Sequence, residues 1–335
     1  MRKRSYDNKM ILWLQAIAIV LVVLGHSYPT EYVFEDITFF RRLLICFQMA
    51  LFFSISGFLF GAKTEKYRVN MSGFIYGKIK NLLIPYLFVT TLSYLVKVPL
   101  SQYALRPVNW SWKEYLHGLV YPWDNPNVFL WYIPTLFVLF LVFILIAKIY
   151  DFRNKYINVV LFIALAILCY YISPYHRVST PLNIYGCLKY LFFFYIGMLM
   201  AIYKPAILAL FSRKSRIVLF CILSLVTLVL LQFTKEEIYL FTGLAGIMFF
   251  WSLCYLLKKI SCPVMETIGR YTYQIFLFSW FGNQAVIITC WKILHWNENI
   301  CIALAFVAGV GFPLVLCYAV EKYIRSDKMR MLIGM

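Results

Sequence analysis

The chain has 335 residues, of which 63% are hydrophobic and only 14% carry a charge. A soluble globular domain has roughly half apolar residues and about a quarter charged ones, so this composition excludes a soluble protein. The apolar residues form repeated runs of about 17 to 25 residues, the length that crosses the hydrocarbon core of a bilayer. The sequence therefore predicts an all-α protein, a polytopic bundle of transmembrane helices.

The apolar runs predict about ten spanning helices in a single domain that covers residues 1–335. No small-residue cleavage site follows the first run, so we expect that run to remain as a helix and not to be a signal peptide. The expected spans lie at residues 10–28, 43–61, 81–98, 127–147, 157–173, 184–203, 216–234, 237–257, 271–291 and 300–321. Most of the nine cysteines lie within these runs without a CxxC pair, so we expect them to pack as small apolar residues and predict no metal site.

The formal net charge of +18 follows the expected topology. If the N-terminus is cytoplasmic, the inner segments contain 23 of the 32 Lys and Arg residues. That asymmetry is the positive-inside bias, and with an even number of spans it predicts that both termini are cytoplasmic. The basic charge is thereby explained without nucleic acid as a partner. We expect a multi-pass protein of the cell membrane, in contact with lipid, and the bacterial plasma membrane fits best. The sequence does not fix the oligomeric state.

Two expected outer segments carry most of the polar residues. Residues 29–42 are acidic and end on Arg41 and Arg42, and residues 99–126 are rich in Trp, Tyr and Pro. Aromatic side chains in such a loop either anchor the protein at the headgroups or pack on the apolar faces of sugars. Similarly, the two arginines either meet an anionic acceptor or pair with the nearby acids, Glu31, Glu35 and Asp36.

All four histidines lie at or beyond the expected outer ends of spans, and His26 alone continues an unbroken helical pattern. An ionisable group at membrane depth is costly and is a candidate for function, although an interfacial anchor is an equal alternative. Gln15 lies eleven residues earlier, which is three helical turns plus roughly 20°, and about 16 Å away along the axis. Both polar residues therefore share one face, which we expect to line the bundle interior or a wet cavity. The loop histidines His117, His176 and His295 need no function.

Several stretches, in this order, resemble the acyltransferase-3 family of integral membrane enzymes, which acylate sugars and other extracytoplasmic acceptors. Each motif alone is weak, but their order and spacing are fairly specific and cover nearly the whole chain. The stretches are LQAIAIVLVVLGH (14–26), FQMALFFSISGFLFG (47–61), FIYGKIKNLLIPYL (74–87), FLWYIPTLF (129–137), YLFFFYIGMLMA (190–201) and IGRYTYQIFLF (268–278).

The resemblance implies a catalytic role for His26, an acyl-CoA donor (most simply acetyl-CoA) and a hydroxyl acceptor outside. Three positions depart from the family pattern. Gln15 replaces an arginine, the basic Arg-x-x-Arg pattern becomes Lys78-Ile79-Lys80-Asn81, and Ser279 replaces a histidine. We expect Lys78 and Lys80, with Asn81 and Gln15, to contact the donor.

The acceptor side is expected to include Trp131, Arg41, Arg42 and Asp124. Asp36 and Asp124 are the candidate carboxylates for orienting His26. The predicted function is a membrane O-acyltransferase that moves an acetyl group from cytoplasmic acyl-CoA to a hydroxyl of an extracytoplasmic or lipid-linked carbohydrate, with His26 as general base. A transporter or flippase of a lipid-linked glycan and a catalytically silent scaffold are the alternatives.

Overall fold

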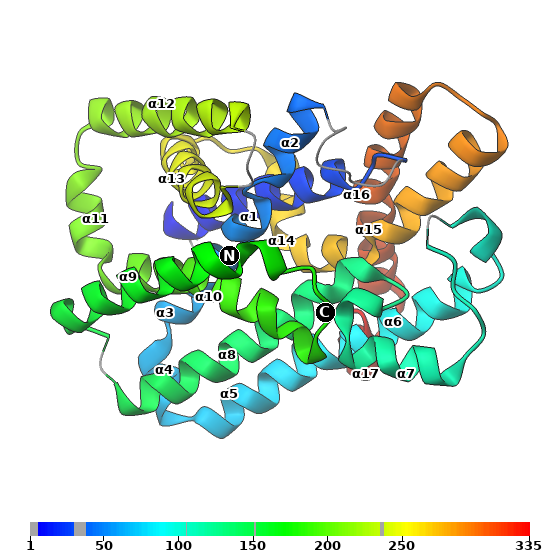
Figure 1. The fold of residues 1–335 in the computed structure, drawn as a ribbon, viewed down its shortest axis with the longest axis horizontal. Coiled ribbons are helices and arrows are strands. Elements are labelled where there is room, and N and C mark those ends of the chain that lie inside the picture. Colours follow the sequence, from blue (N-terminus) through cyan, green and yellow to red (C-terminus); the bar gives the residue numbers. More distant parts are fainter. Residues whose placement is uncertain (1–5, 30–37, 105, 151, 235–237) are drawn as a thin grey trace.

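The computed structural model describes residues 6–29, 38–104, 106–150, 152–234 and 238–335 (Figure 1). All regular structure in this part of the chain is helical. The long helices are α1 (Tyr6–Gly25), α3 (Gln48–Gly61), α6 (Ile84–Lys97), α8 (Tyr132–Ile149), α9 (Lys155–Ile172), α10 (Ile184–Ile202), α12 (Lys214–Leu230), α13 (Tyr239–Leu257), α15 (Thr272–Val286) and α16 (Glu298–Tyr323).

Short helices extend or connect the long ones. The short α-helices are α2 (Phe39–Ile45), α4 (Thr64–Val69), α5 (Met71–Lys78), α7 (Trp112–Val120), α11 (Lys204–Leu210), α14 (Pro263–Arg270) and α17 (Asp327–Leu332). The π-helices are η1 (Ile79–Leu83) and η8 (Ile287–Ile293). The 3₁₀ turns are η2 (Ser101–Tyr103), η3 (Pro122–Asp124), η4 (Val128–Trp131), η5 (Ser173–Tyr175), η6 (Pro181–Asn183) and η7 (Leu231–Phe233).

Among the described residues, eight helical stretches are long and apolar enough to cross a membrane. They run over Phe39–Gly61, Met71–Lys97, Val128–Ile149, Lys155–Tyr175, Pro181–Ile202, Lys214–Phe233, Tyr239–Leu257 and Glu298–Tyr323. Each coincides with one of the ten expected spans. The protein is therefore a polytopic helical membrane protein, as its composition predicted.

The two remaining expected spans are shorter or irregular. The apolar part of α1 covers Lys9–Gly25, so the helix ends just before His26 instead of continuing to residue 28. The run at 271–291 is α15, whose last turns widen into the π-helix η8. Such π-helical turns lack regular i→i−4 bonds and often occur at functional sites. Figure 1 shows α15 packed along α16, and α12 packed along α13.

The second span is broken near its outer end. Its helical stretch begins at Phe39, four residues before the expected start, and is interrupted at Cys46 and Phe47 between α2 and α3. Phe47 leaves helical geometry with φ −131° and ψ −16°. The carbonyl of Cys46, freed by this break, accepts a hydrogen bond from Thr242 Oγ1 at 3.1 Å. The break separates α2 from α3. Helix α2 carries Arg41 and Arg42, the two arginines of the outer segment.

The centre of the bundle is the tight crossing of α3 and α10. A Cβ on Gly57 would lie 1.9 Å from the Phe194 carbonyl oxygen, and a Cβ on Gly197 would lie 1.8 Å from that of Ser54. Only glycine fits at either position, as small residues generally allow membrane helices to approach closely.

At the periphery, α9 exposes apolar side chains. Only 11% of its spanning window is buried, against 67% for the stretch that contains α3. Val159, Val160 and Ile163 are exposed on its surface. An apolar helix that buries so little of itself within the protein is typical of a lipid-facing position.

Six of the nine cysteines are buried inside the protein.

Candidate active site

A cavity of about 630 Å³ opens at the ends of several helices, and His26 lies in its wall. Its lining comes from segments that the charge distribution places toward the outer side. They are the end of α1, α2, the start of α3, the end of α6, the loop before α8, the segment around His176, η7, the start of α13 and the last turns of α15. A cavity of this volume lies within the range of small-molecule sites, roughly 300 to 1,000 Å³.

The backbone of His26 is fixed by the last turn of α1. Its amide N–H donates to the carbonyl oxygens of Val22 and Val23, at 3.1 and 3.2 Å. The next residue, Ser27, is fully buried and donates from Oγ to Val23 O at 2.7 Å. The imidazole lies against the Phe129 ring, with the centroids 3.9 Å apart and the planes inclined by 30°. Within the described residues, no hydrogen bond to the imidazole is present.

Basic side chains surround the cavity. Arg41, Arg42, Lys97, Arg106 and Arg177 line it, and they come from separate parts of the chain. The predicted residues Arg41 and Arg42 thus lie in the same cavity as His26. Their predicted acidic neighbours Glu31, Glu35 and Asp36 lie outside the described residues.

The positions of the two arginines are held by neighbouring groups. The guanidinium of Arg41 lies 4.6 Å from the centroid of the Tyr28 ring, a cation–π contact. Arg42 Nη1 donates to the carbonyl oxygen of Gln232 at 3.2 Å, which ties α2 to η7. Both interactions keep the cationic side chains at the cavity wall.

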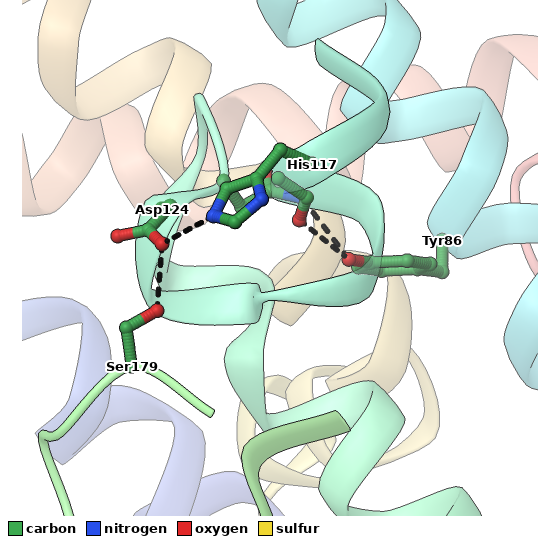
Figure 2. Close-up of polar contacts among 6 residues, drawn as sticks. Tyr86, His117, Asp124 and Ser179 are labelled. Carbon is green, nitrogen blue, oxygen red and sulfur yellow. Dashed lines mark hydrogen bonds and ion pairs between the residues drawn. The ribbon is translucent and has the colours of Figure 1, made fainter. Parts of the chain in front are cut away.

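The carboxylate of Asp124 is the acidic group among the described lining residues. Its Oδ2 lies 3.1 Å from His117 Nε2 and accepts a hydrogen bond from Ser179 Oγ at 2.6 Å (Figure 2). Asp124 is therefore engaged with His117 of α7 and with Ser179 instead of orienting His26, which corrects that expectation. The pairing joins the loop before α8 to the segment before α10 at the cavity wall.

One wall of the cavity is aromatic. Trp131 stacks between Trp123 and Tyr190, with centroids 5.3 and 5.4 Å away and planes inclined by 17° and 25°. Trp123 Nε1 donates to Asn183 Oδ1 at 3.0 Å, which fixes the orientation of its indole. Trp131 thus lies in the same cavity as His26. Stacked rings with fixed polar edges suit the flat apolar face of a sugar.

His176, which was expected to need no function, also lines this cavity. Its Nδ1 lies 2.6 Å from the carbonyl oxygen of Ser173, which assigns the proton to Nδ1. Burial lowers the pKa of His176 well below its usual value, and the charges of Lys189 and Arg177 lower it further. The imidazole is therefore neutral at neutral pH. A histidine in a loop carries no periodic signal, so only the fold reveals this position.

The residues predicted to contact the donor do not line this cavity. Lys78 is half-buried where α5 meets η1, with Nζ 3.6 Å from the centroid of the Phe140 ring. Lys80 and Asn81 are exposed on η1. Gln15, which was expected to line the bundle interior or a wet cavity, is half-buried within α1 and lies outside the wall of this cavity. The cavity is confined to the helix ends, whereas Gln15 lies about three turns deeper.

A buried polar stripe on α6 was not predicted. Its four members are spaced as i, i+4, i+7 and i+11, so they share one helix face: Tyr86, Thr90, Ser93 and Lys97. They bond to the segment Asn125-Pro126-Asn127, which follows η3 and precedes η4. The stripe was readable from its spacing in the sequence, but its partner was not.

Comparison with known protein families identifies the chain. A family model described as an acyltransferase domain, that of the acyltransferase-3 family, matches residues 8–321. The chain belongs to this family. No characterised protein and no solved structure matches the chain. The protein is thus a multi-pass membrane acyltransferase, and its large cavity is the candidate active site of an acyltransferase-3 enzyme.

Proposed function

We propose that this acyltransferase-3 protein is an O-acetyltransferase of the bacterial plasma membrane. It takes the acetyl group from cytoplasmic acetyl-CoA and transfers it to a hydroxyl group of an extracytoplasmic or lipid-linked carbohydrate. The observation that carries the proposal is the position of His26, at the tip of α1 in the wall of a cavity with stacked aromatic rings. An imidazole and a set of stacked aromatic rings suited to a sugar thus share one cavity.

His26 is the general base in this proposal. A sugar hydroxyl is a weak nucleophile at neutral pH, and imidazole is the side chain best suited to accept its proton there. A ring nitrogen of His26 takes the hydroxyl proton while the oxygen attacks the thioester carbonyl carbon. The carbon–sulfur bond then breaks, and the CoA thiolate receives the proton from the imidazolium. His26 therefore both removes the proton from the hydroxyl group and returns it to the leaving thiolate.

The donor approaches from the opposite side in this scheme. Lys78 and Lys80 belong to the inner basic segments, and cationic groups there suit the phosphates of CoA. Because His26 lies at the other end of α1, the acyl arm has to pass between the helices to reach it. Gln15, three turns from His26 on the same helix, is the polar residue at intermediate depth. Arg41 and Arg42, which line the cavity, are then on the acceptor side with Trp131.

The test is a comparison of the surface glycans of cells with and without this gene by mass spectrometry. We expect loss of the gene to remove an acetyl-sized, alkali-labile mass from an otherwise unchanged glycan. A transporter would instead change the amount of glycan at the surface, and a scaffold would change neither mass nor amount directly. Unchanged acetylation across all surface glycans would contradict the proposal.

A further inference from the structure

The only ring stacked on the imidazole of His26 within the described residues is Phe129. The two centroids are 3.9 Å apart and the planes are inclined by 30°. Contact through the ring face restricts rotation of the imidazole, while its nitrogens lie at the ring edge and stay accessible for proton transfer. Among the described residues no hydrogen bond holds the imidazole, and the Phe129 ring is the aromatic contact that constrains its orientation.

The backbone that carries Phe129 is itself held by buried hydrogen bonds. Asn125 is 2% exposed, and its amide nitrogen donates to Tyr86 Oη at 3.0 Å and to Gly118 O at 3.2 Å. Its carbonyl oxygen accepts from the backbone N–H of Asn127 at 2.8 Å. The side chain of Asn125 therefore bonds both to α6 and α7 and to the backbone of Asn127, just before η4.

The next two residues continue the attachment to α6. Lys97 Nζ donates to the carbonyl oxygen of Pro126 at 2.8 Å, and Asn127 Nδ2 donates to Ser93 Oγ at 3.2 Å. Leu130 N–H then donates to Asn127 O at 3.1 Å, which starts η4. Three consecutive residues are thus bonded to one face of a spanning helix, two residues before Phe129.

We propose that the segment Asn125-Pro126-Asn127 and Phe129 form a positioning element for His26. The polar stripe of α6 holds the segment, the segment fixes the backbone of Phe129, and the Phe129 ring holds the imidazole for proton transfer. This role rests on the proposed function, in which His26 is the general base. Phe129 is a positioning residue in this scheme because it acts through His26.

The first test replaces the ring of Phe129. The purified, reconstituted protein is assayed with labelled acetyl-CoA and with surface polysaccharide from the source cells, de-O-acetylated by mild alkali. Phe129→Leu keeps an apolar side chain but removes the ring face. We expect kcat to fall about 10- to 100-fold, because misplacement of a catalytic group by about 1 Å costs this much. The KM values for polysaccharide and acetyl-CoA should stay within about twofold.

Two further variants separate positioning from other roles. Phe129→Tyr keeps the ring and should restore most of kcat. Phe137→Leu makes the same change on α8, at a half-buried position outside the cavity lining, and should behave as wild type. Asn127→Ala breaks the attachment to Ser93 and should lower kcat in the manner of Phe129→Leu, which keeps the proposal testable if one variant fails to fold.

The outcomes distinguish this role from the proposed function itself. A raised KM for polysaccharide with unchanged kcat would show that Phe129 binds the acceptor, and would overturn the positioning role. Wild-type kinetics in Phe129→Leu, together with an inactive His26→Ala, would overturn the positioning role alone. An active His26→Ala would overturn the general-base assignment first.

Discussion

Replacement of Asn125 by Ala tests whether the loop before α8 is fixed by its buried hydrogen bonds. The side chain interacts with Tyr86, Thr90 and Gly118 through its nitrogen, and with the N–H of Asn127 through its oxygen. A net hydrogen bond contributes about 1 kcal/mol, and an unsatisfied buried donor costs about 1–3 kcal/mol.

The expected loss of stability in Asn125→Ala follows from which groups find other partners. Tyr86 Oη retains a hydrogen bond to Leu119 O at 3.1 Å, so its proton stays paired. The N–H of Asn127 has no such replacement among the described residues. Together these terms predict a loss of about 2–4 kcal/mol in the free energy of unfolding. A loss of this size lowers the melting temperature by about 3–6 °C.

The assay uses the protein's own thiols. Six of the nine cysteines are buried, so a fluorogenic maleimide reports unfolding of the detergent-purified protein as it is heated. Asn299→Ala, at an exposed position near the start of α16, is the matched control and should melt with wild type. If Asn125→Ala also melts with wild type, the buried bonds do not hold the loop and the reasoning is refuted.

Three further predictions concern topology and the donor. In a cysteine-free background, a single cysteine at Asn109 should react with an impermeant reagent from outside and one at Lys66 should not, because of the positive-inside bias; labelling of position 66 from outside would reverse the orientation. Replacing Lys78 and Lys80 together by Gln should raise the KM for acetyl-CoA several-fold and leave the acceptor KM unchanged, since these charges are expected to meet the CoA phosphates; an unchanged donor KM would remove both from the site. Gln15→Arg, which introduces the residue usual in the family, should retain activity, and loss of expression would place Gln15 in a purely apolar contact.

The spanning helices were predictable because hydrocarbon solvation dictates composition over each whole span. The break at Cys46 and Phe47 was not, since neither Gly nor Pro marks it and the Thr242 bond that stabilises it comes from a distant helix. The length of α1 was overestimated because the expected span ran on to residue 28, just before Pro29, while the helix stops at Gly25.

The candidate site was predicted in part. Arg41, Arg42 and Asp124 were chosen from outer segments and Trp131 from the outer end of an expected span, and the structure places all four in the cavity with His26. Their expected position at the outer side of the membrane was sufficient for this prediction, because the outer ends of several helices line the cavity. Contacts across the cavity were not predictable. The pairing of Asp124 with His117 of α7 and the contact of the Phe129 ring with His26 depend on how segments distant in the sequence meet.

The central claim is tested most directly by acetyl transfer in the His26 variants. Wild-type protein, His26→Ala and His26→Gln are reconstituted at equal amounts, with labelled acetyl-CoA and alkali-treated surface polysaccharide, and alkali-labile label on the polysaccharide is measured. The account predicts transfer by wild type and a loss on the order of 10²–10⁴-fold or more in both variants, because neither side chain can accept and return a proton. Transfer by correctly inserted His26→Ala at a rate near that of wild type would contradict it.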